Sequence, residues 1–226
     1  MCHRENQTNE DDPCMANPRP QPPASSSDFK SLQSKSEATE LLQRLTSIFP
    51  ESQVVVETNI LAVLTPCNVQ DSQFHWAHPD EISVAHHKTL VHEEHLTKVL
   101  QEKHGGLEVR VEKSVFLERN VYARKIFLVS PDGTTVAHAI LLAFLDRLPA
   151  AVGEGVREEK VPFGRLLMQH VSERCVHLMS CWHVELGRDL EPHLCSQAHR
   201  RTSGRVVTIE CAGKVAAEVL EILRVE

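Results

Sequence analysis

Hydrophobic and polar positions along this chain change their period, and these changes divide it into predicted helices and strands. Five large apolar residues recur at helical spacing over 41–49, after an S-K-S-E sequence at Ser34 that resembles a capping box. Residues 91–106 also predict a helix, with acids near the start, lysines later and a glycine stop. From residue 107 the period becomes two, because apolar residues alternate with charged ones, which is typical of a strand.

Two long hairpins continue this strand pattern. The sequence NVYARKIFLVSPDGTTVAHAILLAFL, residues 120–145, is predicted to turn at 131–133, where proline, aspartate and glycine follow one another. The sequence GRVVTIECAGKVAAEVLEIL, residues 204–223, is predicted to turn at 212–213. Each hairpin places two strands side by side in an antiparallel arrangement.

The remaining segments complete the predicted architecture. Residues 53–66 and 174–186 favour strands, whereas 68–81 is interpreted as an irregular connection. Residues 1–33 are rich in proline and serine and poor in large apolar side chains, so they predict a disordered tail. The chain is therefore predicted to form a single α+β domain over 34–226, with a mostly antiparallel β-sheet and flanking helices.

Composition and charge exclude several classes of partner. The 226 residues are 41% hydrophobic and carry a net charge of −7, and no basic stripe that would bind nucleic acid is present. The longest apolar run, 137–145, is much shorter than the roughly 20 residues needed to cross a bilayer. The N-terminal residues do not resemble a secretory signal, which predicts a cytoplasmic location. The seven cysteines contain no C-x-x-C pair and are interpreted as mostly reduced thiols.

Charged residues stand at strand positions where apolar neighbours would be expected. Arg124 shares a strand face with Ile126, and Lys125 lies on the opposite face. Near the C-terminus, Glu221 and Glu218 likewise fall on opposite faces of one strand, each among apolar residues. A buried charge is costly unless it is paired or used. The alternative is an exposed sheet face, where such charges simply meet water.

The segment VPFGRLL, residues 161–167, places proline, phenylalanine and glycine directly before a predicted helix. Proline before a helix and glycine at its start are ordinary helix punctuation. A functional interpretation is also open, in which this segment closes over a bound ligand.

Taken in order, these motifs resemble those of the chorismate pyruvate-lyase family. The resemblance covers roughly residues 60 to 226 and rests on HLTK (95–98), ARKIFLV (123–129), SPDG (130–133), PFGR (162–165) and LEIL (220–223). It implies the fold of that family, a chorismate lyase-like antiparallel sheet with helices against it.

The resemblance also implies roles for particular residues. Arg124 matches the arginine that binds a substrate carboxylate, for which a guanidinium fork is well suited. Glu221 matches the catalytic glutamate best, with Glu218 as the alternative because the register of the hairpin can slip. The substrate-binding wall is implied to come from Leu96, Phe163 and Gly164.

The implied reaction removes pyruvate from chorismate, or from a related carboxylated enolpyruvyl ring compound, to give a hydroxybenzoate such as 4-hydroxybenzoate. The partner is then a small-molecule carboxylate, and neither a metal nor an organic cofactor is needed. The alternative is a non-catalytic protein that binds small aromatic acids on the same scaffold. Both interpretations need the arginine at position 124, so the sequence does not separate them.

Histidines and cysteines are further candidates for a functional site. The spacing H-x-x-H at His92 and His95 would place two rings on adjacent helical turns, as in some zinc sites. No acidic or cysteine partner stands at a recognisable spacing, so no metal site is predicted. Cys175, Cys181 and Cys211 lie in predicted strands without a catalytic motif and are interpreted as buried structural thiols.

Overall fold

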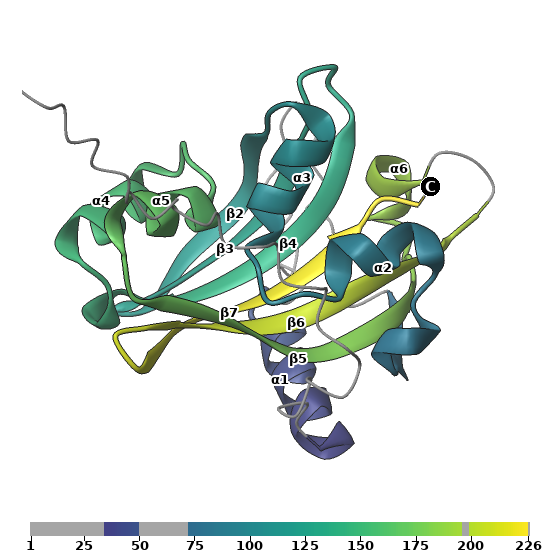
Figure 1. The fold of residues 1–226 in the computed structure, drawn as a ribbon, viewed down its shortest axis with the longest axis horizontal. Helices are drawn as coiled ribbons and strands as arrows, with labels where there is room; N and C mark the ends of the chain where they lie inside the picture. The colour runs from purple at the N-terminus through teal and green to yellow at the C-terminus, as the bar shows by residue number, and fades with distance from the viewer. Residues whose placement is uncertain (1–33, 50–71, 196–198, 226) are drawn as a thin grey trace, which may run out of the picture.

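The structure, a computed structural model, describes residues 34–49, 72–195 and 199–225, which form one seven-stranded sheet with helices on both faces (Figure 1). The strands are β1 Gln73–Ala77, β2 Glu108–Glu118, β3 Val121–Val129, β4 Thr135–Phe144, β5 Arg174–Glu185, β6 Arg201–Cys211 and β7 Lys214–Leu223. The α-helices are α1 Lys35–Ser47, α2 Val84–Leu90, α3 Leu96–His104, α4 Ala150–Glu158, α5 Phe163–His170 and α6 Glu191–Leu194. Two short 3-10 helices, η2 Pro79–Glu81 and η3 Leu145–Arg147, complete the described elements.

All neighbouring strands pair antiparallel, in the order β1-β5-β6-β7-β4-β3-β2. The α+β architecture with an antiparallel sheet and flanking helices is therefore confirmed. The strand predicted at 53–66 and the tail predicted at 1–33 lie outside the described residues. No helix in the described part of the chain is both long enough and apolar enough to cross a membrane.

The sheet separates two hydrophobic cores. On the front face, α2, α3, α4 and α5 pack against the sheet and contribute residues such as Leu100, Val152 and Leu167. On the back face, α1 and α6 contribute residues such as Leu45 and Leu194 (Figure 1). Because side chains alternate along a strand, each central strand supplies both cores, and burying one such leucine contributes about 1.5–3 kcal/mol.

Both predicted hairpins form with the predicted turns. Between β3 and β4, the Asp132 carboxylate accepts hydrogen bonds from the Ser130 hydroxyl and the Thr134 amide, at 2.6 and 3.0 Å. Gly133 follows with φ of 83°, a conformation that glycine adopts without strain. The β6–β7 turn also uses positive φ, at Ala212 and Gly213. Local turn chemistry therefore sets both hairpins.

The first helix also begins as predicted. The Ser34 side chain accepts from the Glu37 amide at 3.4 Å, and the Glu37 carboxylate accepts from the Ser34 amide at 3.0 Å. This reciprocal capping box satisfies backbone donors that the first helical turn leaves without partners.

The helix predicted over 91–106 is wrong in part: α3 covers Leu96–His104 and ends at Gly105 as predicted, whereas residues 91–95, after the end of α2, are not helical. The His92 ring bonds the Thr89 carbonyl at 2.7 Å and accepts from the Glu94 amide at 3.0 Å. Arg205, from β6, donates to the carbonyls of His92 and Glu94 at 2.9 and 3.1 Å. These contacts use backbone groups that a continuous helix would need, so the chain bends between α2 and α3.

The irregular connection predicted over 68–81 is also wrong in part, because residues 73–77 form strand β1 at the sheet edge. This strand pairs with β5, and Phe74 packs edge-on against Trp182 with ring centroids 6.4 Å apart. Its five residues give too short an alternation to predict a strand, so the pairing with β5 decides its conformation.

Candidate functional site

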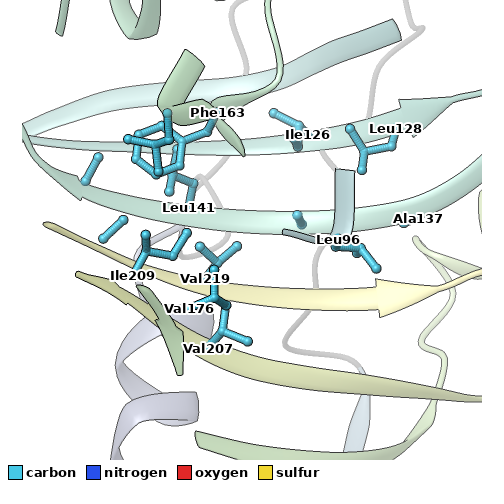
Figure 2. Close-up of a cluster of buried hydrophobic side chains, with 14 of the residues drawn as sticks. Leu96, Ile126, Leu128, Ala137, Leu141, Phe163, Val176, Val207, Ile209 and Val219 are labelled. Carbon is cyan, nitrogen blue, oxygen red and sulfur yellow. The ribbon is translucent and has the colours of Figure 1, made fainter. Parts of the chain in front are cut away.

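A small cavity lies between the front face of the sheet and the first turns of α3 and α5, and its volume is about 40 Å³. Its floor includes Arg124, Leu141 and Glu221 from three neighbouring strands, and its roof includes Leu96 and Phe163. Figure 2 shows the Leu96 and Phe163 side chains over this part of the sheet. At roughly 10–15 Å³ per water, the space holds about three water molecules.

Strand register brings Arg124 and Glu221 to the same cavity. Arg124 on β3 pairs with Leu141 on β4, which pairs with Val219 on β7. Glu221 stands two residues beyond Val219 and therefore points to the same face. The two residues are thus on strands separated by β4. Along the strand direction, Glu221 is displaced by two residues from the position in register with Arg124.

Arg124 is fully buried yet poorly partnered. Its Nη2 donates to the Val161 carbonyl at 3.3 Å, but its Nε and Nη1 make no hydrogen bond of normal geometry with the described residues. Burial lowers the pKa of Arg124, while nearby Tyr122 and Glu159 act in the opposite direction. A guanidinium remains charged in proteins, so two nitrogens of a buried cation lack acceptors for their N–H groups.

Tyr122 and Glu159 form a linked pair beside Arg124. The Tyr122 hydroxyl donates to a Glu159 carboxylate oxygen at 2.6 Å. Burial and this carboxylate raise the pKa of Tyr122 to about 12, so the phenol stays protonated at neutral pH. Glu159 thus supplies negative charge near Arg124 without pairing with it directly.

Glu221 is held by a second fully buried arginine, Arg205 on β6. The Arg205 Nε donates to Glu221 Oε2 at 2.6 Å. Its Nη1 donates to the carbonyls of Leu90 and His92, at 3.0 and 2.9 Å, and its Nη2 donates to the Glu94 carbonyl. Arg205 therefore ties the carboxylate on β7 to the segment that leads into α3.

His95 stands at the start of α3 and lines the cavity. Its Nε2 is buried and has no hydrogen-bond partner among the described residues. Burial, and then the positive charge of Arg174, lower the pKa of His95 to about 4. The imidazole is therefore neutral at pH 7.

The Pro-Phe-Gly-Arg segment is the start of α5, with Pro162 as the residue before the first turn. At Gly164, a Cβ would lie 3.2 Å from the His95 Cβ and 3.3 Å from the Thr97 hydroxyl oxygen. Glycine therefore lets α5 approach α3 closely, and Arg165 adds a 3.0 Å hydrogen bond to the Gln101 side chain. This segment forms one wall of the cavity.

The structure brings together the residues that the sequence proposed for a site. The cavity is lined, among others, by Leu96, Arg124, Phe163, Gly164 and Glu221. Glu218, the alternative to Glu221, lies on the back face and pairs with Arg44 on α1 at 2.5 Å. Geometry therefore places Glu221, and not Glu218, at the cavity.

Sequence reasoning missed Arg205 as part of this arrangement and set His95 aside. A signal for Arg205 was present, because it alternates with Val207 and Ile209 and so shares their face. Cys181 and Cys211 are buried as predicted, whereas Cys175 is exposed and that part of the prediction is wrong. Cys175 is the second residue of β5, at the start of the strand, where its side chain is exposed.

The H-x-x-H spacing does not form a metal site in the described ranges. Both ring nitrogens of His92 are engaged, by Thr89, Glu94 and Arg205, so its ring is not directed at His95 as a ligand pair. Across residues 34–49, 72–195 and 199–225, no three His, Cys, Asp or Glu side chains lie close enough to hold a metal ion.

A larger hollow, of about 440 Å³, lies at the β1–β5–β6 end of the sheet and includes His75, His183 and Arg201. Both histidines are exposed, and the Arg201 side chain is 87% exposed. Water solvates and screens such groups, so their hydrogen-bonding capacity is satisfied without a ligand. The small cavity is the stronger candidate because its charge is buried.

No protein-family model matches the sequence, and no curated protein matches it either.

Proposed function

We propose that this chain binds a small aromatic carboxylate in the front-face cavity and removes pyruvate from chorismate or a related enolpyruvyl ring compound, without a cofactor. The supporting observation is the buried guanidinium of Arg124, which lines the same cavity as Glu221 and lacks acceptors for two of its nitrogens. A buried cation with unused donors is costly unless an anion joins it. A carboxylate is the ligand group that best matches a guanidinium.

The proposed reaction depends more on the orientation of the substrate than on strong acid or base catalysis. One ring proton leaves, the ring carbon–oxygen bond of the ether breaks, and the released enolpyruvate takes up a proton to become pyruvate. The ring becomes aromatic, so the protein chiefly has to orient the substrate and exclude water. Arg124 holds the ring carboxylate, and Glu221 assists proton movement or hydrogen-bonds the leaving oxygen.

In this scheme, Arg205 fixes the orientation of the Glu221 carboxylate. It holds Oε2 of Glu221 at 2.6 Å, so we assign Oε1 to the substrate. A carboxylate anchored on one oxygen has fewer conformations to lose when a substrate arrives.

The cavity has to widen before a ring compound enters, because about 40 Å³ is far below the roughly 300–1,000 Å³ of typical small-molecule pockets. Phe163 and Leu141 both line this cavity, and Figure 2 draws their side chains within the same buried cluster. We infer that outward movement of Phe163 and the first turn of α5 opens the site.

Binding without turnover is the second candidate, and two observations favour it. The cavity is narrow, and one oxygen of Glu221 is already committed to Arg205. In that case Arg124 still binds the carboxylate, whereas Glu221 serves only to anchor Arg205.

The test is to incubate the purified chain with chorismate and to quantify 4-hydroxybenzoate and pyruvate by chromatography. Arg124→Met and Glu221→Gln should both abolish product formation. Glu218→Gln is the matched control, because Glu218 lies on the same strand and also pairs with an arginine, but on the back face. Its activity should stay at the wild-type level.

The two candidates are separated by adding a binding measurement to this experiment. If folded protein makes no product but binds 4-hydroxybenzoate, and Arg124→Met weakens that binding by about 10- to 150-fold, the protein is a binder. If neither turnover nor binding is seen, the carboxylate proposal is wrong.

A further inference from the structure

We propose that His95 is the second ligand-binding side chain of this cavity and that it hydrogen-bonds to an uncharged oxygen, a hydroxyl or ether, of the bound carboxylate compound. The inference rests on the proposed function, because it takes Arg124 as the carboxylate clamp. The His95 contact specifies a second group of the ligand, at a distance from the carboxylate that Arg124 binds. The ligand class becomes a ring acid that also carries an uncharged polar oxygen.

The first argument is the unmet hydrogen-bonding capacity of the imidazole. His95 is 7% exposed, lines the cavity, and its Nε2 has no partner in the described part of the chain. A buried polar atom without a partner lowers stability, so native proteins seldom retain one without a reason. Arg124 shows the same unmet capacity at the same cavity.

His92 provides an internal comparison three residues earlier. Burial lowers the pKa of each of the two rings to about 4. The His92 ring nonetheless has partners at both nitrogens, including the Thr89 carbonyl at 2.7 Å and the Glu94 amide at 3.0 Å. Burial of a histidine in this segment therefore does not by itself leave a nitrogen unpartnered, and the cavity-facing position of His95 is what differs.

The charge around His95 restricts what it can bind. Arg174, Arg205 and Lys98 all disfavour a protonated ring, and only Glu94 favours one. The ring is therefore neutral at pH 7 and does not act as a second anion clamp. A neutral imidazole accepts from a hydroxyl at one nitrogen and donates at the other. Because Arg124 already takes the carboxylate in this scheme, we assign an uncharged oxygen of the ligand to the imidazole.

Packing holds the imidazole in place. Gly164 approaches so closely that a Cβ there would lie 3.2 Å from the His95 Cβ and 3.3 Å from its Cγ. The ring has no room to swing towards α5, so its polar edge stays with the cavity. Outward movement of Phe163, which directly precedes Gly164 in α5, would change the space in front of this edge.

The experiment compares two probes that differ by one hydroxyl, benzoate and 4-hydroxybenzoate, by isothermal titration calorimetry at pH 7. The wild type should bind 4-hydroxybenzoate three- to tenfold more tightly, as expected for one neutral hydrogen bond. His95→Leu should bring this ratio close to one while changing benzoate affinity less than twofold. His95→Gln, which keeps a polar group, should restore part of the preference.

His92→Gln is the matched control and should keep the wild-type ratio. A wild-type ratio near one, or a ratio that survives in His95→Leu, would overturn the role of His95 and leave the Arg124 clamp intact. Failure of the wild type to bind either probe would overturn the clamp and the His95 contact together.

Nuclear magnetic resonance of the wild type keeps the proposal testable if His95→Leu does not fold. The side-chain nitrogen signal of His95 should shift when 4-hydroxybenzoate is added and should shift much less with benzoate. The signal of His92 should respond to neither. Equal responses of both histidines to both probes would contradict a direct contact at His95.

Discussion

Two arginines on the front face of the sheet are both fully buried, yet their surroundings are opposite. Arg205 pairs with Glu221 at 2.6 Å and donates to three backbone carbonyls of the segment before α3. Arg124 has one 3.3 Å bond, to the Val161 carbonyl, and two nitrogens without acceptors. Arg205 therefore belongs to the architecture, whereas the unused donors of Arg124 support the proposal that it binds a ligand.

The two arginines should differ in their effect on stability, because the free-energy cost of burying a charge depends on its hydrogen bonds. A buried charge with a full set of hydrogen bonds is tolerated, and removing its partner strands the remaining charge. A buried charge without those bonds lowers stability in the unliganded protein. Arg205 and Arg124 should therefore respond in opposite directions to the same substitution.

The largest effect is expected at Arg205. Arg205→Met leaves the Glu221 carboxylate and several carbonyls without donors, and should lower the free energy of unfolding by about 3–5 kcal/mol. Urea unfolding followed by circular dichroism measures this. Arg205→Met combined with Glu221→Met should cost less than Arg205→Met alone, because no carboxylate is then stranded. A loss of less than about 1 kcal/mol in the single variant would contradict the structural role assigned to Arg205.

Acid should produce the next largest effect, through histidines that stand near cations. Burial, reinforced by Lys125, lowers the pKa of His138 to about 3, and the pKa values of His92 and His95 are about 4. The unfolded chain binds protons below about pH 6.5 and the folded chain does not, so stability falls as the pH drops from 6.5 towards 4. His138 alone should contribute about 3 kcal/mol to this loss.

Urea titrations at pH 7, 5.5 and 4.5 test the acid effect. His138→Leu should flatten the dependence on pH, since the leucine does not titrate. A wild-type stability that is constant over this range would show that these rings are protonated in the folded state.

The smallest effect is expected at Arg124 and has the opposite sign. Arg124→Met removes a poorly bonded buried cation and should raise the free energy of unfolding by about 1–2 kcal/mol. The same variant should lose carboxylate binding. Together, the two results would show that the wild type retains a destabilising arginine because the arginine binds the ligand. Thermal and urea unfolding without ligand measure the gain. A loss above about 1 kcal/mol would mean that Arg124 is structural, as Arg205 is.

Much of the local structure was predictable because it depends on neighbours in the chain. The capping box at Ser34, the turns at 131–133 and 212–213, and the period of two along the strands all act over a few residues. The same period placed Arg124 with Ile126, and Glu221 opposite Glu218. The break between α2 and α3 was not predictable in this way, because Arg205 supplies it from β6.

The sequence therefore predicts which residues share a strand face, where the hairpins turn and that charges stand among apolar neighbours. The cavity that Glu221 and Arg124 share follows from the fold, because it depends on β7 pairing with β4 rather than with another strand. The fold also decides which arginine is satisfied, since the backbone carbonyls that accept from Arg205 belong to residues more than 100 positions away. Periodicity carries information over a few residues, whereas strand order and hydrogen-bond partners depend on packing across the whole chain.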